Sequence, residues 1–289
     1  MDQLTNKFFA QSSSSAPEVI AITSGKGGVG KTNLSVNLSL TLQKMNRRIL
    51  LFDADIHLGN VDLFLGLRPR YSIMDFAINN VAMSDVIMRN YHGVDILPSS
   101  ASIHSFVEQE KSIINKLGRA FKDLESQYDN IVVDTGAGIG ENVISFLLGA
   151  DKIVLLVTPD PASIADAYGV IKIVKSFSFD GPIIMVSNMV RSNVEGERIF
   201  QKMNLMVRRF LKSQIIYAGS ITEDDLILDA IRQQIPVILK HPESPAVSSI
   251  KAIAHRIIKQ PRKMDTIEST LFKRVRNNRQ LLNESDSYV

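Results

Sequence analysis

Short, nearly continuous runs of apolar residues recur between residues 18 and 260 and alternate with longer segments of helical period. The runs predict seven strands: EVIAITS (18–24), RRILLFDAD (47–55), GVDILPS (93–99), NIVVDTG (130–136), KIVLLVTP (152–159), GPIIMVSN (181–188) and QIIYAG (214–219). Strands that lack a polar face are typical of a sheet covered on both sides.

Segments with helical period separate these strands, at residues 31–45, 102–127, 141–149, 162–177, 194–212, 223–233 and 245–259. Repeated strand–helix units predict an α/β fold: a mostly parallel sheet, right-handed crossovers and helices on both faces. Ligands bind such sheets beyond the carboxyl ends of the strands, so functional side chains are expected there.

The two ends of the chain differ from this core. Residues 1–17 are polar and include a serine run, which predicts a flexible N-terminal extension. Residues 18–260 form the predicted catalytic domain, and residues 261–289 form a more polar C-terminal tail. No apolar run approaches the ~18 to 20 residues that cross a bilayer. The N-terminus lacks the features of a secretion signal, so a cytoplasmic protein is expected.

The tail contains a predicted amphipathic helix within residues 262–282. Its apolar stripe consists of Met264, Ile267, Leu271, Val275 and Leu282, with Phe272 beside it. Because Lys273 and Arg276 point away from the stripe, the helix could lie reversibly on an anionic inner-membrane surface. The alternative is that the same stripe packs on the protein's own core, and the acidic Asp265 and Glu268 in its first turn keep that alternative open.

Composition narrows the function further. The formal net charge is only +3, so any basic partner surface must be local and no direct binding of nucleic acid is expected. The chain contains no cysteine. Disulfides, thiolate zinc sites and cysteine-held iron–sulfur clusters are therefore excluded.

A glycine-rich stretch joins the first predicted strand to the first helix and fits the phosphate-loop pattern G-x-x-x-x-G-K-[ST]. It consists of Gly25, Lys26, Gly27, Gly28, Val29, Gly30, Lys31 and Thr32, followed by Asn33. Backbone N–H groups of such a loop, together with the helix N-terminus, hold phosphates. Lys31 is expected at the β- and γ-phosphates, and the Thr32 hydroxyl at Mg²⁺.

Three carboxylates follow at the ends of two further predicted strands. Asp53 and Asp55 share one side of an extended segment, and Asp134 ends a buried apolar strand. Each could be a turn-forming residue by itself. Their position beside the loop instead predicts a shared site for Mg²⁺ and phosphate.

The residues after a later strand bear on the choice of nucleotide. Guanine sites in P-loop proteins usually show N-K-x-D, whereas the sequence here reads Ser187-Asn188-Met189-Val190. Because the Asn188 amide can pair with adenine, ATP is favoured over GTP.

The run KGGVGKT, with its second lysine, resembles the deviant Walker A motif of the ParA/MinD class of ATPases, which have the SIMIBI type of P-loop fold. The resemblance implies a slow, Mg²⁺-dependent ATPase that dimerises on binding ATP. In that class the signature lysine, here Lys26, reaches the partner's ATP. The resemblance further implies that Asp55 orients the attacking water, that Asp53 helps to hold Mg²⁺, and that Asp134 is the switch II carboxylate.

Several longer stretches resemble one branch of that class, the flagellar-number regulators FlhG/FleN. They are DADIHLGNVDLFLGL, DTGAGIG, TPDPASIADAYGVIK, SNMVRSNVEG and HPESPAVSSIKAIAHRI. The resemblance implies the SRP-type GTPase FlhF, flagellar C-ring switch proteins or a flagellar transcription regulator as partners. Division-site placement of the MinD type and DNA partition of the ParA type are the alternatives. A scaffold with an inactive loop is disfavoured because Lys31, Thr32, Asp55 and Asp134 are all present.

Two features of the sequence depart from the pattern of the flagellar branch, and a third, His57, adds little to the predicted site. Thr222 stands where the family's GxIPxD segment usually has proline, which affects the expected adenine packing. The start MDQLTNKFF retains only Asp2 and Gln3 of a DQAxxLR-like activator of the partner GTPase, so it is either a degraded activator or a plain flexible start. His57 lies in the expected switch I, where a lone histidine is more often a spectator than a base.

Overall fold

The computed structural model describes residues 16–55, 59–79, 81–99, 116, 118, 120, 121, 124–263 and 270–286. Several predictions therefore fall outside the described residues. They concern the extension before Ala16, His57 in the expected switch I, most of the helix predicted over 102–127, and the start of the predicted tail helix with Met264, Asp265, Ile267 and Glu268.

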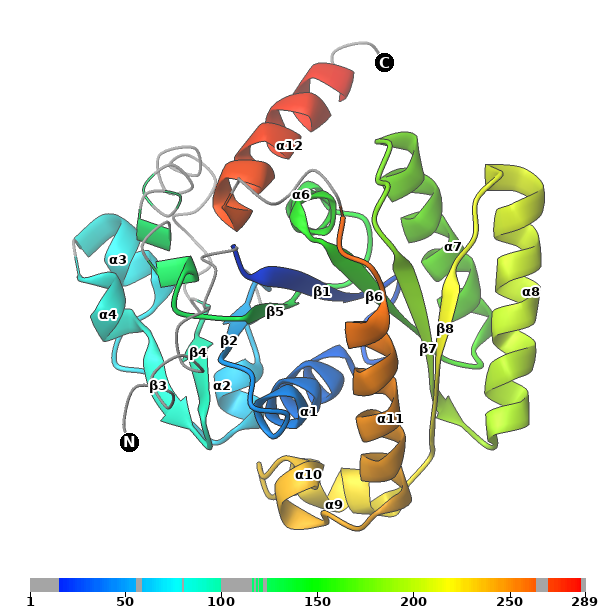
Figure 1. Cartoon of the computed structure of the whole chain (residues 1–289), viewed down its shortest axis with the longest axis horizontal. Helices are drawn as coiled ribbons and strands as arrows, with labels where there is room; N and C mark the ends of the chain where they lie inside the picture. The colour runs from blue at the N-terminus through cyan, green and yellow to red at the C-terminus, as the bar shows by residue number, and fades with distance from the viewer. Residues whose placement is uncertain are drawn as a thin grey trace, which may run out of the picture.

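An eight-stranded sheet forms the centre of the molecule, in the order β3-β4-β2-β5-β1-β6-β7-β8 (Figure 1). The strands are β1 (Glu18–Ser24), β2 (Ile49–Asp53), β3 (Met88–Tyr91), β4 (Val94–Leu97), β5 (Asn130–Asp134), β6 (Lys152–Val157), β7 (Ile183–Val190) and β8 (Ile216–Thr222). All neighbours are parallel except β3 and β4. The seven predicted strands are present. The sequence analysis missed β3, whose residues MRNY carry no apolar run.

Helices cover both faces of the sheet (Figure 1). They are α1 (Lys31–Gln43), α2 (Val61–Phe64), α3 (Ile73–Asn79), α4 (Met83–Val86), α6 (Glu141–Gly149), α7 (Pro161–Ser176), α8 (Asn193–Leu211), α9 (Asp225–Arg232), α10 (Val237–Lys240), α11 (Pro245–Lys259) and α12 (Leu271–Asp286). One apolar core packs under α6, α7, α8 and α12, and a second packs under α1 and α11. The predicted α/β architecture is thus confirmed. None of the described helices is long and apolar enough to cross a membrane.

The tail helix α12 packs on the protein itself, which is the second of the two alternatives left open by the sequence. Leu271, Phe272 and Val275 are fully or almost fully buried against α6. The Phe272 ring lies 4.4 Å from that of Phe121 and 5.7 Å from that of Phe52, centroid to centroid. The described part of the stripe, Leu271, Phe272, Val275 and Leu282, is therefore part of the core in this structure, and lipid binding through it would require α12 to leave α6.

Polar contacts fix the start of α12 in the same place. The carboxylate of Glu125 accepts a hydrogen bond from the backbone N–H of Leu271 at 2.8 Å. Arg274 of α12 and Arg262, which precedes the tail helix, both form ion pairs with the buried Asp151 at 3.2 Å. Because a helix N-terminus has unpaired N–H groups, Glu125 stabilises the docked helix at the point where those groups would otherwise be buried without partners.

Burial raises the pKa of Glu125 from its ordinary 4.5 to about 7. The folded chain therefore binds more protons than the unfolded chain between pH 4.5 and 7, and this group's contribution makes the free energy of unfolding fall as pH rises through that window. We expect Glu125→Gln to match the wild type near pH 5 and to be more stable by roughly 2 kcal/mol at pH 8. Urea unfolding at several pH values measures the gap. A gap that does not change with pH would contradict the prediction.

Candidate functional site

The glycine-rich loop leaves the carboxyl end of β1 and enters α1 through two residues with positive φ, Gly28 at 75° and Gly30 at 93°. A Cβ atom built on Gly27 or Gly28 would have no neighbour within 4 Å, so the loop borders open space on this side. A Cβ on Gly25 would instead lie 2.2 Å from the backbone of Asp166 in α7. The loop is thus pressed against α7 at its start and open where a phosphate group would lie.

Lys31 extends from the first position of α1 back toward β1. Its ammonium nitrogen lies 3.2 Å from the hydroxyl of Ser24, a contact that the sequence analysis did not predict. Burial lowers the pKa of Lys31, and the nearby Asp134 and Asp55 partly offset that effect. A partly buried cation whose hydrogen-bond partner among the described residues is a neutral hydroxyl is suited to an anionic ligand.

The hydroxyl of Thr32 donates to one carboxylate oxygen of Asp134 at 2.7 Å, and Ser35 donates to the other at 2.8 Å. Asp134 is 2% exposed at the end of β5. Burial raises the pKa of Asp134 to about 6, although both hydroxyls act against that shift. The predicted pair of Thr32 and Asp134 is therefore brought together, and Ser35 joins it from one turn further along α1.

Asp53 ends β2 next to Asp134, to which it is paired in the sheet register. Its two carboxylate oxygens accept backbone N–H groups of Asp55 and Val61, each at 3.1 Å. Burial first, and the charge of Asp134 second, raise the pKa of Asp53 to about 8. Asp53 thus holds both ends of the segment that joins β2 to α2. The carboxyl carbon of Asp55 lies 3.6 Å from a Cβ built on Gly136.

These oxygen atoms fit a hard divalent cation. Asp53 and Asp134 are neighbouring buried carboxylates whose ionisation is disfavoured, and a cation beside them would remove that cost. No group of three or more acidic or histidine ligands occurs among the described residues. Mg²⁺ suits such an incomplete set, because it commonly keeps waters and takes its other ligands from phosphates.

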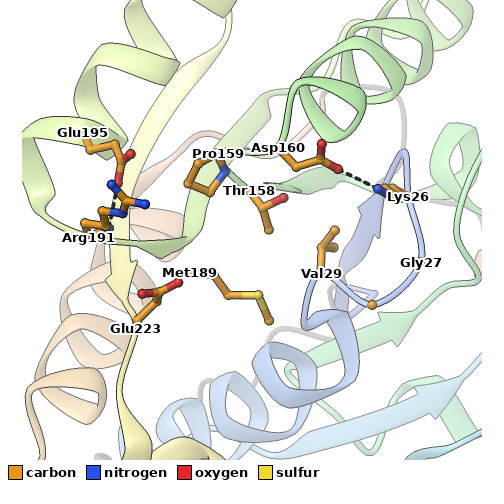
Figure 2. Close-up of a pocket in the computed structure, with 11 residues that line it drawn as sticks. Lys26, Gly27, Val29, Thr158, Pro159, Asp160, Met189, Arg191, Glu195 and Glu223 are labelled. Carbon is orange, nitrogen blue, oxygen red and sulfur yellow. Dashed lines mark hydrogen bonds and ion pairs between the residues drawn. The ribbon is translucent and has the colours of Figure 1, made fainter.

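Lys26 is the exposed cation of the loop. Its ammonium nitrogen lies 2.6 Å from the carboxylate of Asp160, and both side chains are nearly half exposed (Figure 2). The hydrogen bond with Asp160 raises the pKa of Lys26. Asp160 also accepts the backbone N–H of Ala162, so it caps α7. The sequence analysis missed Asp160, although an aspartate between two prolines at a strand end is a signal for a helix cap.

A cavity of about 480 Å³ opens between the loop and the ends of β6, β7 and β8 (Figure 2). It is lined by Lys26, Gly27, Gly28, Val29, Thr158, Pro159, Asp160, Met189, Arg191, Glu195 and Glu223. Glu195 accepts the backbone N–H of Arg191 at 2.6 Å and so fixes the loop after β7. The cavity adjoins the glycine-rich loop and could hold the base and sugar of a nucleotide.

Two predicted nucleotide-binding side chains have other contacts here. The Asn188 amide donates a hydrogen bond to the carbonyl of Val29 at 2.7 Å and so stabilises the glycine-rich loop. Asn188 is not among the residues that line the cavity. The Asn33 side chain is 7% exposed and accepts a hydrogen bond from Asn37 one turn along α1. Direct contact of either with a nucleotide stays a prediction. Glu195 and Glu223, which the analysis did not single out, line the cavity instead.

Comparison with known proteins gives consistent results. The family AAA_31, described as an AAA domain, matches residues 17–180. The antiactivator FleN of Pseudomonas aeruginosa is 38% identical over 84% of this chain and 87% of its own. The flagellum site-determining protein YlxH of Helicobacter pylori is 34% identical over 74% of this chain and 73% of its own. The Mg-ADP complex of the septum site-determining protein MinD from Pyrococcus horikoshii superposes with a TM-score of 0.68 at 26% identity, over 84% of this chain and 96% of that one.

Proposed function

The chain belongs to the MinD/ParA-type P-loop ATPases, in the branch that contains FleN, and from this premise we propose that it is an ATP-driven switch that regulates the number or placement of flagella. One observation carries the proposal. Lys26 is nearly half exposed at the edge of the cavity beside the glycine-rich loop, and Asp160 is its one ion-pair partner among the described residues. A lysine in that position is available to a second copy of the chain.

Support for ATP as the ligand comes from the loop itself. The open face of Gly27 and Gly28 and the buried ammonium of Lys31 would hold the phosphates, and Thr32 with Asp134 and Asp53 would hold Mg²⁺. Bound Mg²⁺ would supply charge neutralisation at the phosphates. This chain's own part is to orient the attacking water, for which Asp55 is the candidate. We propose slow, Mg²⁺-dependent hydrolysis that resets the switch.

Support for a face-to-face dimer comes from exposed apolar side chains. Eight of the twelve large apolar residues that are exposed among the described residues lie in the last residues of a strand or in the segment that directly follows its carboxyl end. They are Leu63, Ile139, Met189, Val194, Leu226, Leu228, Ile231 and Ile235. The nucleotide site lies at the same edge of the sheet. A second copy placed there would remove this apolar surface from water, which favours association.

In the ATP-bound dimer, α12 is proposed to leave α6 and to expose its stripe to an anionic membrane. The helix that α12 covers begins seven residues after the switch II carboxylate, Glu141 after Asp134, so movement at the phosphate site has a short path to the tail. The proposed partners are the SRP-type GTPase FlhF, flagellar C-ring proteins or a flagellar transcription regulator. FleN, the antiactivator among the relatives, makes the last of these a natural candidate.

The Lys26–Asp160 pair must open before Lys26 can reach a partner's nucleotide. We therefore expect Asp160→Asn to strengthen the ATP-dependent dimer by about two- to thirtyfold, because each of the two copies opens one exposed ion pair worth about 0.2 to 1 kcal/mol. Asparagine keeps an oxygen that can cap α7, so α7 should be unaffected. Sedimentation velocity with a non-hydrolysable ATP analogue measures the dimer constant. A weaker dimer in Asp160→Asn would show that Asp160 acts in the dimer and not as a restraint on the monomer.

Deletion of the gene in its source bacterium tests the cellular role. We expect an altered number or position of flagella, restored by the wild-type chain and not by Lys31→Ala, which removes the phosphate-binding cation. Minicells with normal flagella would favour division-site placement of the MinD type, which is supported by the similarity of this chain to MinD proteins in sequence and in structure. Salt-dependent, sequence-independent DNA binding by the ATP-bound protein would favour DNA partition.

A further inference from the structure

The outward side of α8 carries an unbalanced positive charge. Its inward side, with Ile199, Met203 and Val207, is buried against the sheet. Residues 198–212 include no acidic residue and five basic ones: Arg198, Lys202, Arg208, Arg209 and Lys212. All five are exposed. From residue 198 to its end, this helix therefore presents only cations among its charged groups, whereas Glu195 and Glu197 lie in its first turns.

Some of these cations form a straight row together with one apolar residue. Arg198, Lys202, Leu205 and Arg209 of α8 follow one another at intervals of four, three and four residues, and Lys212 follows as the left-handed C-cap just beyond the helix. We call this row the α8 seam. A repeat of four and three keeps side chains on one line along a helix, and it is the spacing by which one helix contacts another that lies alongside.

The carboxyl-terminal half of the helix adds exposed apolar surface. Leu205 is 67% exposed and Phe210 is 64% exposed, higher than any other large apolar side chain among the described residues. The guanidinium of Arg209 lies 5.5 Å from the centre of the Phe210 ring, and Lys212 donates to the carbonyl of Arg209 at 3.1 Å. Exposed aromatic and arginine side chains held in place by such contacts are typical of the centres of protein interfaces.

None of the five cations forms an ion pair within the part of the chain that the structure describes. The helix dipole explains some of them, because basic residues in a last turn stabilise the helix. That reason covers Arg208 and Arg209. It does not cover Arg198 and Lys202, which lie several residues from the end, nor the exposure of Leu205 between the charges.

We propose that the α8 seam binds a helix of a partner protein in which carboxylates flank large apolar side chains. The cations of the seam attract carboxylates, and an arginine side chain can bind a carboxylate through two parallel hydrogen bonds, a bidentate geometry. Leu205 and Phe210 would pack against the apolar side chains of that helix. The seam includes no residue of the nucleotide site, so the inference does not depend on the proposed function.

Two other anionic partners fit the seam less well. A nucleic acid would be bound by the cations through its phosphates, and that binding would not explain why Leu205 and Phe210 are exposed beside them. A membrane binds an amphipathic helix in proportion to the apolar area inserted. The seam itself offers one large apolar side chain, Leu205, with Phe210 beside it. The other side of α8 is fixed on β7 and β8, so the helix cannot turn more apolar surface toward lipid.

The test uses a fluorescent synthetic helical peptide of about 20 residues, the length of α8, with leucine at four–three spacing flanked by glutamate. Anisotropy titration against the full chain should show binding that weakens about tenfold or more, ~1.4 kcal/mol, in Lys202→Gln/Arg209→Gln and in Leu205→Ser. The charge-matched double variant Lys251→Gln/Lys259→Gln, which alters exposed lysines on α11, should bind as the wild type does. A peptide with glutamine in place of glutamate should bind about tenfold more weakly to the wild type.

Equal binding by the seam variants and the α11 control would overturn the proposal, and so would an absence of binding at millimolar peptide. Cosedimentation with phosphatidylglycerol vesicles that the seam variants abolish, without peptide binding, would assign the surface to lipid. ATP hydrolysis and the thermal unfolding midpoint should stay at wild-type values in every seam variant. Loss of either in a variant would show that the seam residue has a structural role, and would remove it from the proposal.

Discussion

Asp55→Ala is expected to lower the rate of ATP hydrolysis by about 10²- to 10³-fold, the usual loss when a group that orients or deprotonates the nucleophile is removed. The ATP-bound dimer should persist, because the contacts proposed to hold nucleotide are made by the loop, Thr32 and Asp134. Phosphate release under single-turnover conditions gives the rate. Light scattering after size exclusion, with ATP present, gives the mass.

A loss of hydrolysis without a loss of the dimer would identify Asp55 as a catalytic group. Its carboxyl lies beside Gly136, in the loop after Asp134, and its backbone N–H is held by Asp53. Alanine at position 55 keeps that backbone contact. Asp85→Ala, which removes an exposed carboxylate from α4, is the matched control and should change neither readout. Parallel loss of dimer and hydrolysis in Asp55→Ala would assign the residue to binding or folding instead.

The fold could be predicted from the sequence because its central strands are buried on both faces. A parallel sheet under two helical layers leaves runs such as KIVLLV with no polar position, and those runs are visible without any structure. The strand β3 was missed for the converse reason. It lies at the edge of the sheet, its residues are polar, and its pairing with β4 is set by the tight turn between them.

Much of the phosphate site was also predictable, since the motif lies in one continuous segment and the carboxylates lie at strand ends. Partners distant in sequence were not. Lys26 and Asp160 are 134 positions apart, and only the adjacency of β1 and β6 brings them together. Ser35 had a local signal that went unused. It is one of several buried polar residues on α1, and buried polar side chains need hydrogen-bond partners.

The position of α12 illustrates a limit of hydrophobic patterning. The stripe of Leu271, Phe272 and Val275 is equally suited to lipid and to a protein core, because both remove it from water. The difference lies in groups outside the stripe. Glu125 and Asp151 provide buried partners for the backbone N–H of Leu271 and for Arg274, and neither is near the tail in sequence.

Lys26→Gln is expected to leave the chain monomeric with ATP bound. Each dimer would contain two contacts in which Lys26 of one copy neutralises the nucleotide of the other, away from water. Loss of such a buried charge contact costs at least about 2 kcal/mol, so the two together should weaken the dimer by roughly 10³-fold. Binding of a fluorescent ATP analogue to the monomer should change little, because Lys31 and the loop backbone are intact.

Hydrolysis should fall together with dimerisation in Lys26→Gln, in contrast to Asp55→Ala, because the missing cation also stabilises the transition state from across the interface. Lys44→Gln, an exposed lysine at the end of α1, is the matched control and should dimerise normally. Sedimentation with a non-hydrolysable analogue decides the outcome. If Lys26→Gln dimerises as strongly as the wild type, Lys26 acts within its own chain, with Asp160 as its functional partner. A different contact must then couple ATP binding to dimerisation.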